Sequence, residues 1–129
     1  MKFSYTIIYV DNVEATVNFY AKTFKQNVLF KHESNEYAEM DTGGTKLAFA
    51  SSDLAKSNGV EFIENKPGNV APGFEITFTC SNVQDCYQHA LENGAINVKT
   101  PVKKPWGQEV AYVRDLNGVI VAICSAMEG

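Results

Sequence analysis

Two stretches of sequence decide the fold: Tyr5-Thr-Ile-Ile-Tyr-Val-Asp-Asn-Val13 and Glu75-Ile-Thr-Phe-Thr-Cys-Ser-Asn-Val83. They superpose at an offset of 70 residues, and both are typical of a β-strand that runs into an α-helix. After each stretch, apolar residues recur with helical spacing. Four positions coincide at this offset: Val13 with Val83, Val17 with Tyr87, Tyr20 with Ala90, and Ala21 with Leu91. The chain is therefore predicted to contain an internal repeat.

Capping signals support the two helix starts. Asp11 with Glu14, and Ser81 with Gln84, match the pattern in which the N-cap residue and the residue three positions later satisfy each other's backbone donors. The second helix is predicted to end at Asn93-Gly94, where glycine can take the left-handed conformation. The alternative to a repeat is coincidence, because many chains place a strand before a capped helix.

A short strand and then a hairpin follow each helix. The short strands are predicted at Asn27–Phe30 and Ile96–Lys99. In the first hairpin Tyr37–Asp41 turns into Lys46–Ala50, and in the second Ala111–Asp115 turns into Ile120–Cys124, at an offset of 74. Glycines in both turns permit positive φ. The fold class predicted is α+β, with two tandem βαβββ units forming a cupped mixed sheet with a ligand cleft.

One domain is expected over residues 1–129, with a first unit at about 1–66 and a second at about 73–127. Residues 51–73 are rich in loop signals, and one strand is predicted there, at Val60–Ile63. The net charge of −4 and the scattered lysines disfavour nucleic acid as a partner. The longest apolar runs are too short for a membrane helix.

The N-terminal stretch lacks a signal-peptide pattern, and the chain has three cysteines: Cys80, Cys86 and Cys124. An odd number of cysteines favours reduced thiols in the cytoplasm. Cys80 and Cys86 are six residues apart with no second pair, which disfavours a zinc cluster. We interpret these cysteines as small buried hydrophobic residues.

These features together resemble the vicinal oxygen chelate superfamily, also called the glyoxalase, bleomycin-resistance and extradiol dioxygenase fold. The resemblance covers essentially the whole chain. It rests on Ile7–Val13 with Asn18-Phe19-Tyr20, on Gly73–Phe78, and on Pro105–Gln108 leading to Tyr112–Gly118. It implies that each βαβββ unit forms half of a cup around a small ligand, and that the protein is a homodimer.

The resemblance also implies where a metal ion would bind. In metal-using members the ligands lie on the first strand of each unit and on the strand after each hairpin. Carried over, these positions hold Tyr5, Glu75, Ala48 and Ala122. Alanine has no donor atom and a neutral phenol is a poor ligand, so only Glu75 remains. Among residues within two positions of the alanines only Cys124 is a good metal ligand, so we expect no metal and no cofactor.

The same positions become candidates for an organic ligand. Tyr5, Ala48, Glu75, Tyr112 and Ala122 are predicted to line the pocket. Strand alternation predicts that Glu75 points into the cup, as a ligand anchor or general base, the alternative being a structural carboxylate bonded to a neighbouring hydroxyl. The tyrosines would suit a flat, partly polar ligand, although aromatic residues on strands are more often core.

Trp106, the only tryptophan, is also a predicted pocket residue. It is expected to cover the mouth of the cleft as a lid or stacking wall, or else to plug a barrel end or a dimer interface.

The sequence is compatible with three functions. The first is a metal-free protein that binds or sequesters an aromatic or antibiotic-like compound. The second is a glyoxalase-like lyase or isomerase, either metal-dependent or using Glu75 as general base. The third is an interaction module whose cup is filled by its own side chains.

Overall fold

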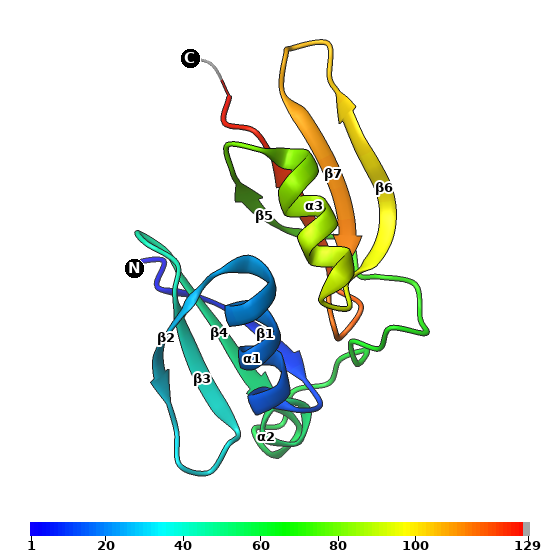
Figure 1. The fold of residues 1–129 in the computed structure, drawn as a ribbon. Helices are drawn as coiled ribbons and strands as arrows, with labels where there is room; N and C mark the ends of the chain where they lie inside the picture. Colours follow the sequence, from blue (N-terminus) through cyan, green and yellow to red (C-terminus); the bar gives the residue numbers. More distant parts are fainter. Residues whose placement is uncertain (128–129) are drawn as a thin grey trace. The chain divides into compact units, whose positions relative to one another are not determined.

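A computed structural model describes residues 1–127, and the chain divides into two compact units (Figure 1). The first unit is Met1–Asn65 and the second begins at Lys66. No helix among the described residues is long and apolar enough to cross a bilayer.

The first unit is a four-stranded sheet with two helices. Its elements are β1 (Tyr5–Val10), α1 (Val13–Phe24), β2 (Asn27–Lys31), β3 (Tyr37–Asp41), β4 (Lys46–Ser51) and α2 (Ser52–Ser57). The strand order is β1-β4-β3-β2. The β1–β4 pair is parallel and the other two pairs are antiparallel. The helix α1 returns the chain, so that β2 runs in the same direction as β1, and β2, β3 and β4 then alternate in direction.

The second unit repeats this arrangement. Its elements are β5 (Glu75–Thr79), α3 (Val83–Glu92), β6 (Ile96–Lys103), β7 (Glu109–Arg114) and β8 (Ile120–Cys124). The strand order β5-β8-β7-β6 and the pairing directions match those of the first unit. The predicted α+β fold with two tandem βαβββ units is confirmed.

The strand registers refine the predicted repeat. The first strands superpose at the predicted offset of 70 and the last strands at 74, since β1 pairs with β4 as β5 pairs with β8. On the first hairpin strand the predicted offset of 74 is wrong by one residue. Asp41 lies opposite Lys46, and Arg114 lies opposite Ile120, which sets an offset of 73. The cause is the second turn, which has one residue more than the first.

Both long helices begin one residue later than the sequence pattern predicts. Asn12 Oδ1 accepts a hydrogen bond from the backbone N–H of Ala15 at 2.9 Å, and Asn82 Oδ1 accepts one from Asp85 N–H at 3.0 Å. Asparagine caps a helix as well as aspartate or serine does, so two adjacent good caps compete in each half. The second helix ends at Asn93 with Gly94 at φ 102°, as predicted.

Each of the two long helices, α1 and α3, covers one face of its own sheet (Figure 1). In the first unit Tyr20 of α1 packs against Phe49 of β4 with ring centroids 4.8 Å apart, and both are fully buried with Met40. Burying one such aromatic side chain contributes roughly 1.5–3 kcal/mol. In the second unit the Tyr87 hydroxyl on α3 donates to Asn97 Oδ1 at 2.7 Å on β6. Strand residues of the opposite parity therefore face away from the helix.

The segment between the units differs from the prediction. Val60–Ile63 is not a strand, and the six-residue helix α2 precedes it instead. Phe62 packs on the ring of Tyr9 at 4.8 Å, and Asn65 Nδ2 donates to the Tyr9 carbonyl at 2.9 Å. Side-chain packing against β1 thus replaces the expected strand pairing.

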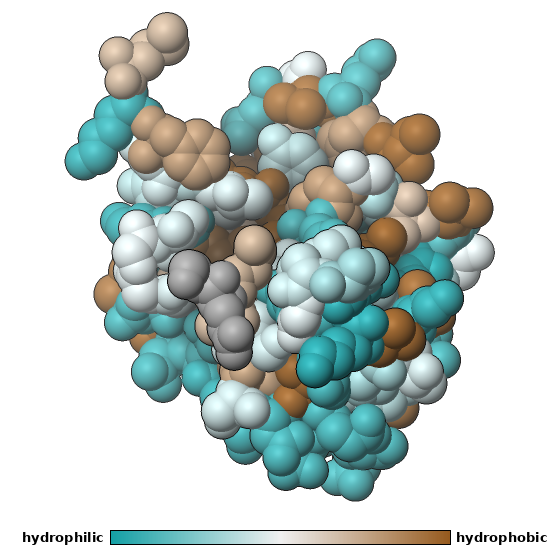
Figure 2. Space-filling model, turned by 90° about the horizontal axis from the view of Figure 1, so that it is seen from above, coloured by the Kyte–Doolittle hydropathy of each residue, from teal (hydrophilic) through white to brown (hydrophobic). Residues whose placement is uncertain are grey.

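Exposed apolar side chains lie among hydrophilic ones in the view of Figure 2 rather than in one continuous patch. By exposed fraction, the exposed apolar residues include Phe3 at 79%, Trp106 at 62% and Met127 at 70%. Single exposed apolar residues are common on proteins.

Candidate functional site

The face of the first sheet opposite α1 has Ala48 at its centre. Ala48 of β4 lies between Ile7 of β1 and Glu39 of β3, and it is fully buried. Because alanine ends at Cβ, the longer neighbours stand above it on both sides. The predicted pocket residue Ala48 therefore forms the floor of this face.

A polar cluster occupies this face. The Tyr37 hydroxyl donates to Glu39 Oε2 at 2.8 Å, and Lys46 Nζ lies 3.7 Å from Glu39 Oε1. Lys46 Nζ also lies 5.1 Å from the centroid of the Tyr5 ring, within range of a cation–π contact. The Glu39 side chain is only 13% exposed. Burial first, and then the hydrogen bond to Glu39, raises the pKa of Tyr37 above that of a free phenol, so its hydroxyl stays a hydrogen-bond donor even in mild alkali.

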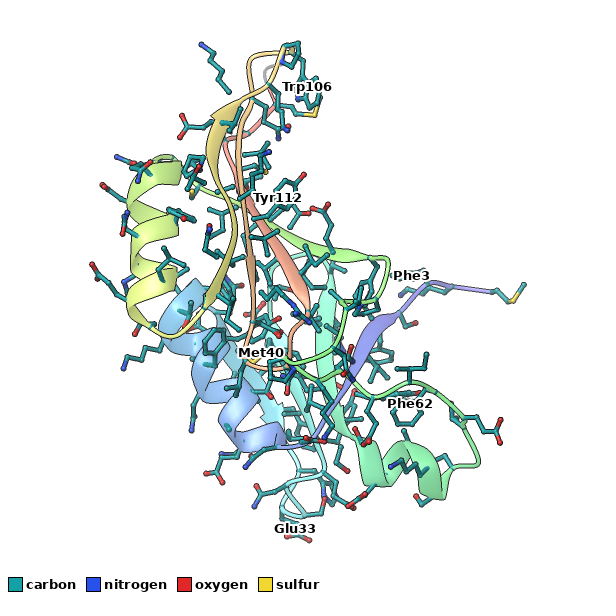
Figure 3. All side chains as sticks on the ribbon, turned by 90° about the vertical axis from the view of Figure 1, so that its right-hand side faces the viewer. Phe3, Glu33, Met40, Phe62, Trp106 and Tyr112 are labelled. Carbon is teal, nitrogen blue, oxygen red and sulfur yellow. The ribbon has the colours of Figure 1, made fainter. Side chains whose placement is uncertain are left out.

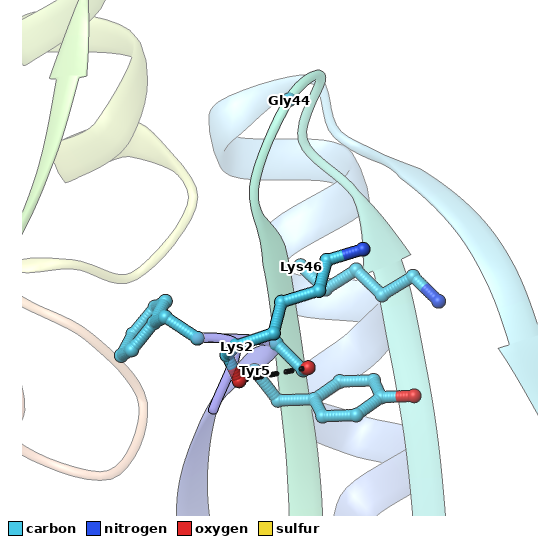
Figure 4. Close-up of a pocket in the computed structure, with 6 residues that line it drawn as sticks. Lys2, Tyr5, Gly44 and Lys46 are labelled. Atoms are coloured by element: carbon cyan, nitrogen blue, oxygen red, sulfur yellow. Dashed lines mark hydrogen bonds between the residues drawn. The ribbon is translucent and has the colours of Figure 1, made fainter.

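A hollow of about 320 Å³ adjoins the cluster (Figure 4). Its lining residues are Lys2, Phe3, Ser4, Tyr5, Gly44 and Lys46. Figure 4 shows the Tyr5 ring and the Lys46 side chain on the side of the strands away from the helix. Tyr5 lines this hollow, and its role in binding a ligand stays a prediction.

The face of the second sheet opposite α3 has Ala122 at its centre. Ala122 of β8 lies between Thr77 of β5 and Tyr112 of β7, in the same place as Ala48 in the first unit. Tyr112 packs against Val110, Ala122 and Cys124. Tyr112 is half-buried and serves as a wall of this face, and it occupies the position that Glu39 holds in the first unit.

Glu75 lies on the same face but is exposed within its own unit. It faces the same side as Thr77, as strand alternation predicts, and the Thr77 hydroxyl donates to Glu75 Oε2 at 2.6 Å. This hydrogen bond agrees with the alternative interpretation of Glu75 as a structural carboxylate bonded to a neighbouring hydroxyl. Burial and, second, the charge of Glu75 raise the pKa of the Cys124 thiol. The catalytic role of Glu75 stays a prediction.

Trp106 lies at the tip of the β6–β7 hairpin (Figure 3). Its Nε1–H donates to Gln108 Oε1 at 2.9 Å, and 62% of its surface is exposed. A second hollow of about 320 Å³ lies in this unit, lined by Ser81, Asn82, Val83, Gln84, Lys103, Gly107, Glu109 and Ser125. Trp106 itself is not among the lining residues, so its role as a lid stays a prediction.

The residues at the expected metal positions do not fit a metal ion. Each unit offers one oxygen donor at these positions, Tyr5 in the first and Glu75 in the second, and the other position in each unit is an alanine, which has none. Among residues 1–127 no three His, Cys, Asp or Glu side chains are grouped so that they could hold a metal ion.

Residues 3–128 match the family described as Glyoxalase-like domain. The chain belongs to this family. The resemblance to the vicinal oxygen chelate superfamily predicted from the sequence is thereby confirmed. No curated protein matches the sequence of this glyoxalase-like chain.

Solved structures share the fold of this glyoxalase-like chain. A glyoxalase-related enzyme from Fulvimarina pelagi superposes with a TM-score of 0.82 at 18% identity, over 98% of this chain and 88% of that one. A glyoxalase/bleomycin resistance protein/dioxygenase from Nocardioides superposes with a TM-score of 0.76 at 17% sequence identity. The match covers 100% of this chain and 85% of that one. A glyoxalase/bleomycin resistance protein/dioxygenase family enzyme from Burkholderia phytofirmans PsJN superposes with a TM-score of 0.76 at 19% sequence identity. The match covers 95% of this chain and 96% of that one. Identities this low establish the fold alone.

The sequence prediction missed Glu39 and Lys46, which form the polar cluster with Tyr37. A signal existed: residues 37, 39 and 41 alternate on one strand with the apolar residues Ala38 and Met40, so the polar ones share the face opposite the core. Glu39 does not lie at a metal-ligand position that the family resemblance implies, and it is not an aromatic residue.

Proposed function

We propose that this glyoxalase-like protein binds a small organic molecule without using a metal ion. The observation that carries the proposal is the makeup of the two sheet faces opposite α1 and α3. At the positions where the family would place metal ligands they hold Tyr5, Ala48, Glu75 and Ala122. The surrounding side chains offer rings, hydroxyls and charges, which suit an organic ligand better than a metal.

An aromatic or antibiotic-like compound is the ligand that these faces favour. Tyr5 is 43% exposed beside the hollow, and Tyr9 and Phe62 form a ring pair on the same unit. Tyr112 supplies a further ring on the second unit, and Trp106 an exposed one. Rings of this kind stack on flat ligands, and phenol hydroxyls orient them by hydrogen bonds. Sequestration of such a compound requires only affinity and shape.

Titration of a panel of aromatic and glycopeptide compounds tests this proposal. We expect at least one compound to quench Trp106 fluorescence or to shift the NMR signals of Tyr5, with the same affinity before and after treatment with a chelator. Tyr5→Ala should weaken binding about tenfold. The matched control Ile63→Ala removes a 90% exposed side chain outside the hollow and should leave affinity unchanged. A panel that gives no response, or binding that requires added metal, contradicts the proposal.

A second candidate is an enzyme that uses Glu75 as a general base in a lyase or isomerase reaction. Its support is the exposed position of the Glu75 carboxylate on the face opposite α3, where a substrate proton could reach it. Glu75→Gln keeps the bond acceptor and removes the base, so turnover should be lost while the fold is retained. Stoichiometric zinc, nickel, manganese or iron in protein purified without chelator would favour a metal-dependent enzyme instead.

The proposal also includes a homodimer in the cytoplasm. Its support is the family to which residues 3–128 belong, in which chains of this length commonly dimerise, together with three free cysteines. Light scattering measures the mass in solution, and a monomer at all concentrations would contradict the dimer.

A further inference from the structure

Cys80 lies at the end of β5, on the side of the sheet that α3 covers. Its backbone N–H donates to the Cys124 carbonyl at 2.9 Å, so it continues the pairing of β5 with β8. Glu75 and Thr77 face away from α3, and strand alternation puts Cys80 on the opposite side from them. The Cys80 side chain therefore points toward α3.

Helical spacing brings Cys86 to the same place. Cys86 lies three residues after Val83 and four before Ala90 on α3, and both of these residues are buried. The Cys86 thiol thus faces the sheet, where it is hydrogen-bonded to the thiol of Cys80. Both of these side chains are partly exposed, whereas Cys124 is buried. The two thiols are therefore in contact with each other and open to small molecules.

The first unit has different residues at this place. At the offset of 70 residues, Cys80 corresponds to Val10 and Cys86 to Thr16. Val10 and Thr16 are fully buried. The first unit therefore fills the junction of strand and helix with side chains that do not form disulfides. The second unit has two thiols there, and both are partly accessible to solvent.

The surroundings of Cys80 give the two thiols different reactivity. Burial first, and then the hydrogen bond to Cys86 and the charge of that residue, raise the pKa of Cys80 to about 12. Cys80 is therefore protonated at neutral pH, and Cys86 is the thiol that attacks first. Once the Cys86 sulfur is covalently modified it carries no charge. One of the causes that keep the proton on Cys80 is then removed.

We propose that Cys80 and Cys86 form a reversible disulfide by exchange with a small disulfide such as oxidised glutathione. The Cys86 thiolate attacks one sulfur of the small disulfide, which forms a mixed disulfide and expels one small thiolate. Cys80 then loses its proton and attacks the Cys86 sulfur, and the second small thiolate leaves. The two protein thiols are oxidised, and the small disulfide is reduced to two thiols that take up the two protons.

The disulfide would connect the end of β5 to the first turns of α3, across the helix cap Asn82. In a reducing thiol pool the pair stays open, and a shift toward oxidised glutathione closes it. Closure restricts residues 80–86 in the unfolded chain, so it should stabilise the second unit. This modification site goes beyond the proposed function, because it requires no ligand in either hollow.

Mass spectrometry tests the proposal on the full chain, after incubation at about pH 8 with mixtures of reduced and oxidised glutathione. Iodoacetamide added with denaturant then alkylates the remaining thiols. Trypsin leaves Cys80 and Cys86 in one peptide, because no lysine or arginine lies between them, and cleavage after Arg114 separates Cys124. We expect the first peptide to carry neither an alkyl group nor glutathione and to be lighter by two hydrogens. The thermal unfolding midpoint should rise on closure.

Serine variants assign the steps of the exchange. In Cys80→Ser the reaction should stop at a glutathione adduct on Cys86. In Cys86→Ser, formation of an adduct on Cys80 should be at least about tenfold slower. The matched control Cys124→Ser removes the buried thiol, which lies 3.6 Å from the Phe78 carbonyl oxygen, and should leave closure of the pair unchanged.

Three results would overturn the proposal. Separate glutathione adducts on Cys80 and Cys86, without a bond between them, would show that the two sulfurs cannot join. No oxidation of the folded chain, under conditions that oxidise the urea-unfolded chain, would show that the pair is not accessible. Equally fast adduct formation in Cys80→Ser and Cys86→Ser would overturn the assigned roles. If either variant fails to fold, the unaltered chain and Cys124→Ser still decide whether the disulfide forms.

Discussion

Arg114 occupies the space that a side chain on Gly118 would need. The Arg114 Nε–H donates to the Gly118 carbonyl at 2.7 Å, and a Cβ added at Gly118 would lie 2.5 Å from Arg114 Nη2. The same Cβ would lie 2.8 Å from the carbonyl oxygen of Lys66 and 2.9 Å from Cα of Pro67. Gly118 also has φ +86°, in the left-handed region. No space therefore remains for a side chain at position 118, because the Arg114 guanidinium and the backbone of Lys66 and Pro67 occupy it.

Gly118→Ala is expected to lower the free energy of unfolding by about 2–4 kcal/mol, because left-handed strain and backbone crowding act together. Urea denaturation measures the loss. Gly107→Ala is the matched control, since Gly107 has φ +93° in the same unit but an added Cβ would meet nothing within 4 Å. The control should lose only about 1 kcal/mol. Equal losses in the two variants would contradict the crowding argument.

Arg114→Met should release the start of the second unit. The guanidinium also donates to the carbonyls of Pro67 at 3.0 Å and Asn69 at 2.6 Å. These charge-assisted bonds are partly exposed, so we expect a loss of about 2 kcal/mol. Hydrogen exchange of the Asn69 amide, which donates to Lys66 O at 3.1 Å, should become faster.

Arg114→Lys is the control for that variant, because it retains the charge without the planar fork. It should recover only part of the stability and of the protection at Asn69. Full recovery would mean that the charge, rather than the fork, holds the segment.

The helix cap of α3 can be assigned by a pair of alanine variants. Asn82→Ala removes the acceptor for the Asp85 N–H and should cost about 1 kcal/mol. Ser81→Ala changes the adjacent residue, which the sequence pattern favoured as the cap, and should cost a few tenths of a kcal/mol. Thermal denaturation compares the two. A larger loss for Ser81→Ala would restore the predicted capping box.

Stability should fall in alkali partly through Cys80. Burial first, and then the hydrogen bond to Cys86, raises the pKa of Cys80 from 9.0 to about 12. The unfolded chain loses this proton first, so the Cys80 contribution is complete below pH 9 and declines as the pH rises toward 12. Urea denaturation at about pH 8 and about pH 11 should show a smaller decline for Cys80→Ala than for the unaltered chain. Parallel declines would contradict the assignment.

Strands and helices with a clear period were predictable from the sequence. Both sheets, both long helices and the hairpins follow alternation or helical spacing, and β3 was predicted with its observed bounds. The helix starts were misplaced by one residue because Asn12 and Asn82 adjoin residues of equal capping strength. Local pattern alone does not separate such neighbours.

Other features depend on contacts between elements. Val60–Ile63 has the composition of a strand, but this segment has irregular backbone structure. Its Phe62 side chain packs instead on the ring of Tyr9. The cluster of Glu39 with Lys46 arises from strand pairing, which brings β3 beside β4. Alternation along β3 already places Glu39 on the face opposite the core, and the register of the hairpin adds that Lys46 shares this face.

The unequal hairpin turns have a practical consequence for engineering. One turn is a residue longer than the other, yet both sheets keep Ala48 and Ala122 at the same place between their neighbours. A change in the length of a turn does not alter the pairing of the strands, so every strand side chain stays on its original face of the sheet. Gly43 and Gly44 at the first turn have open space around them. A short epitope or a fluorescent label grafted between them would report on the neighbouring hollow without altering the sheet that forms it.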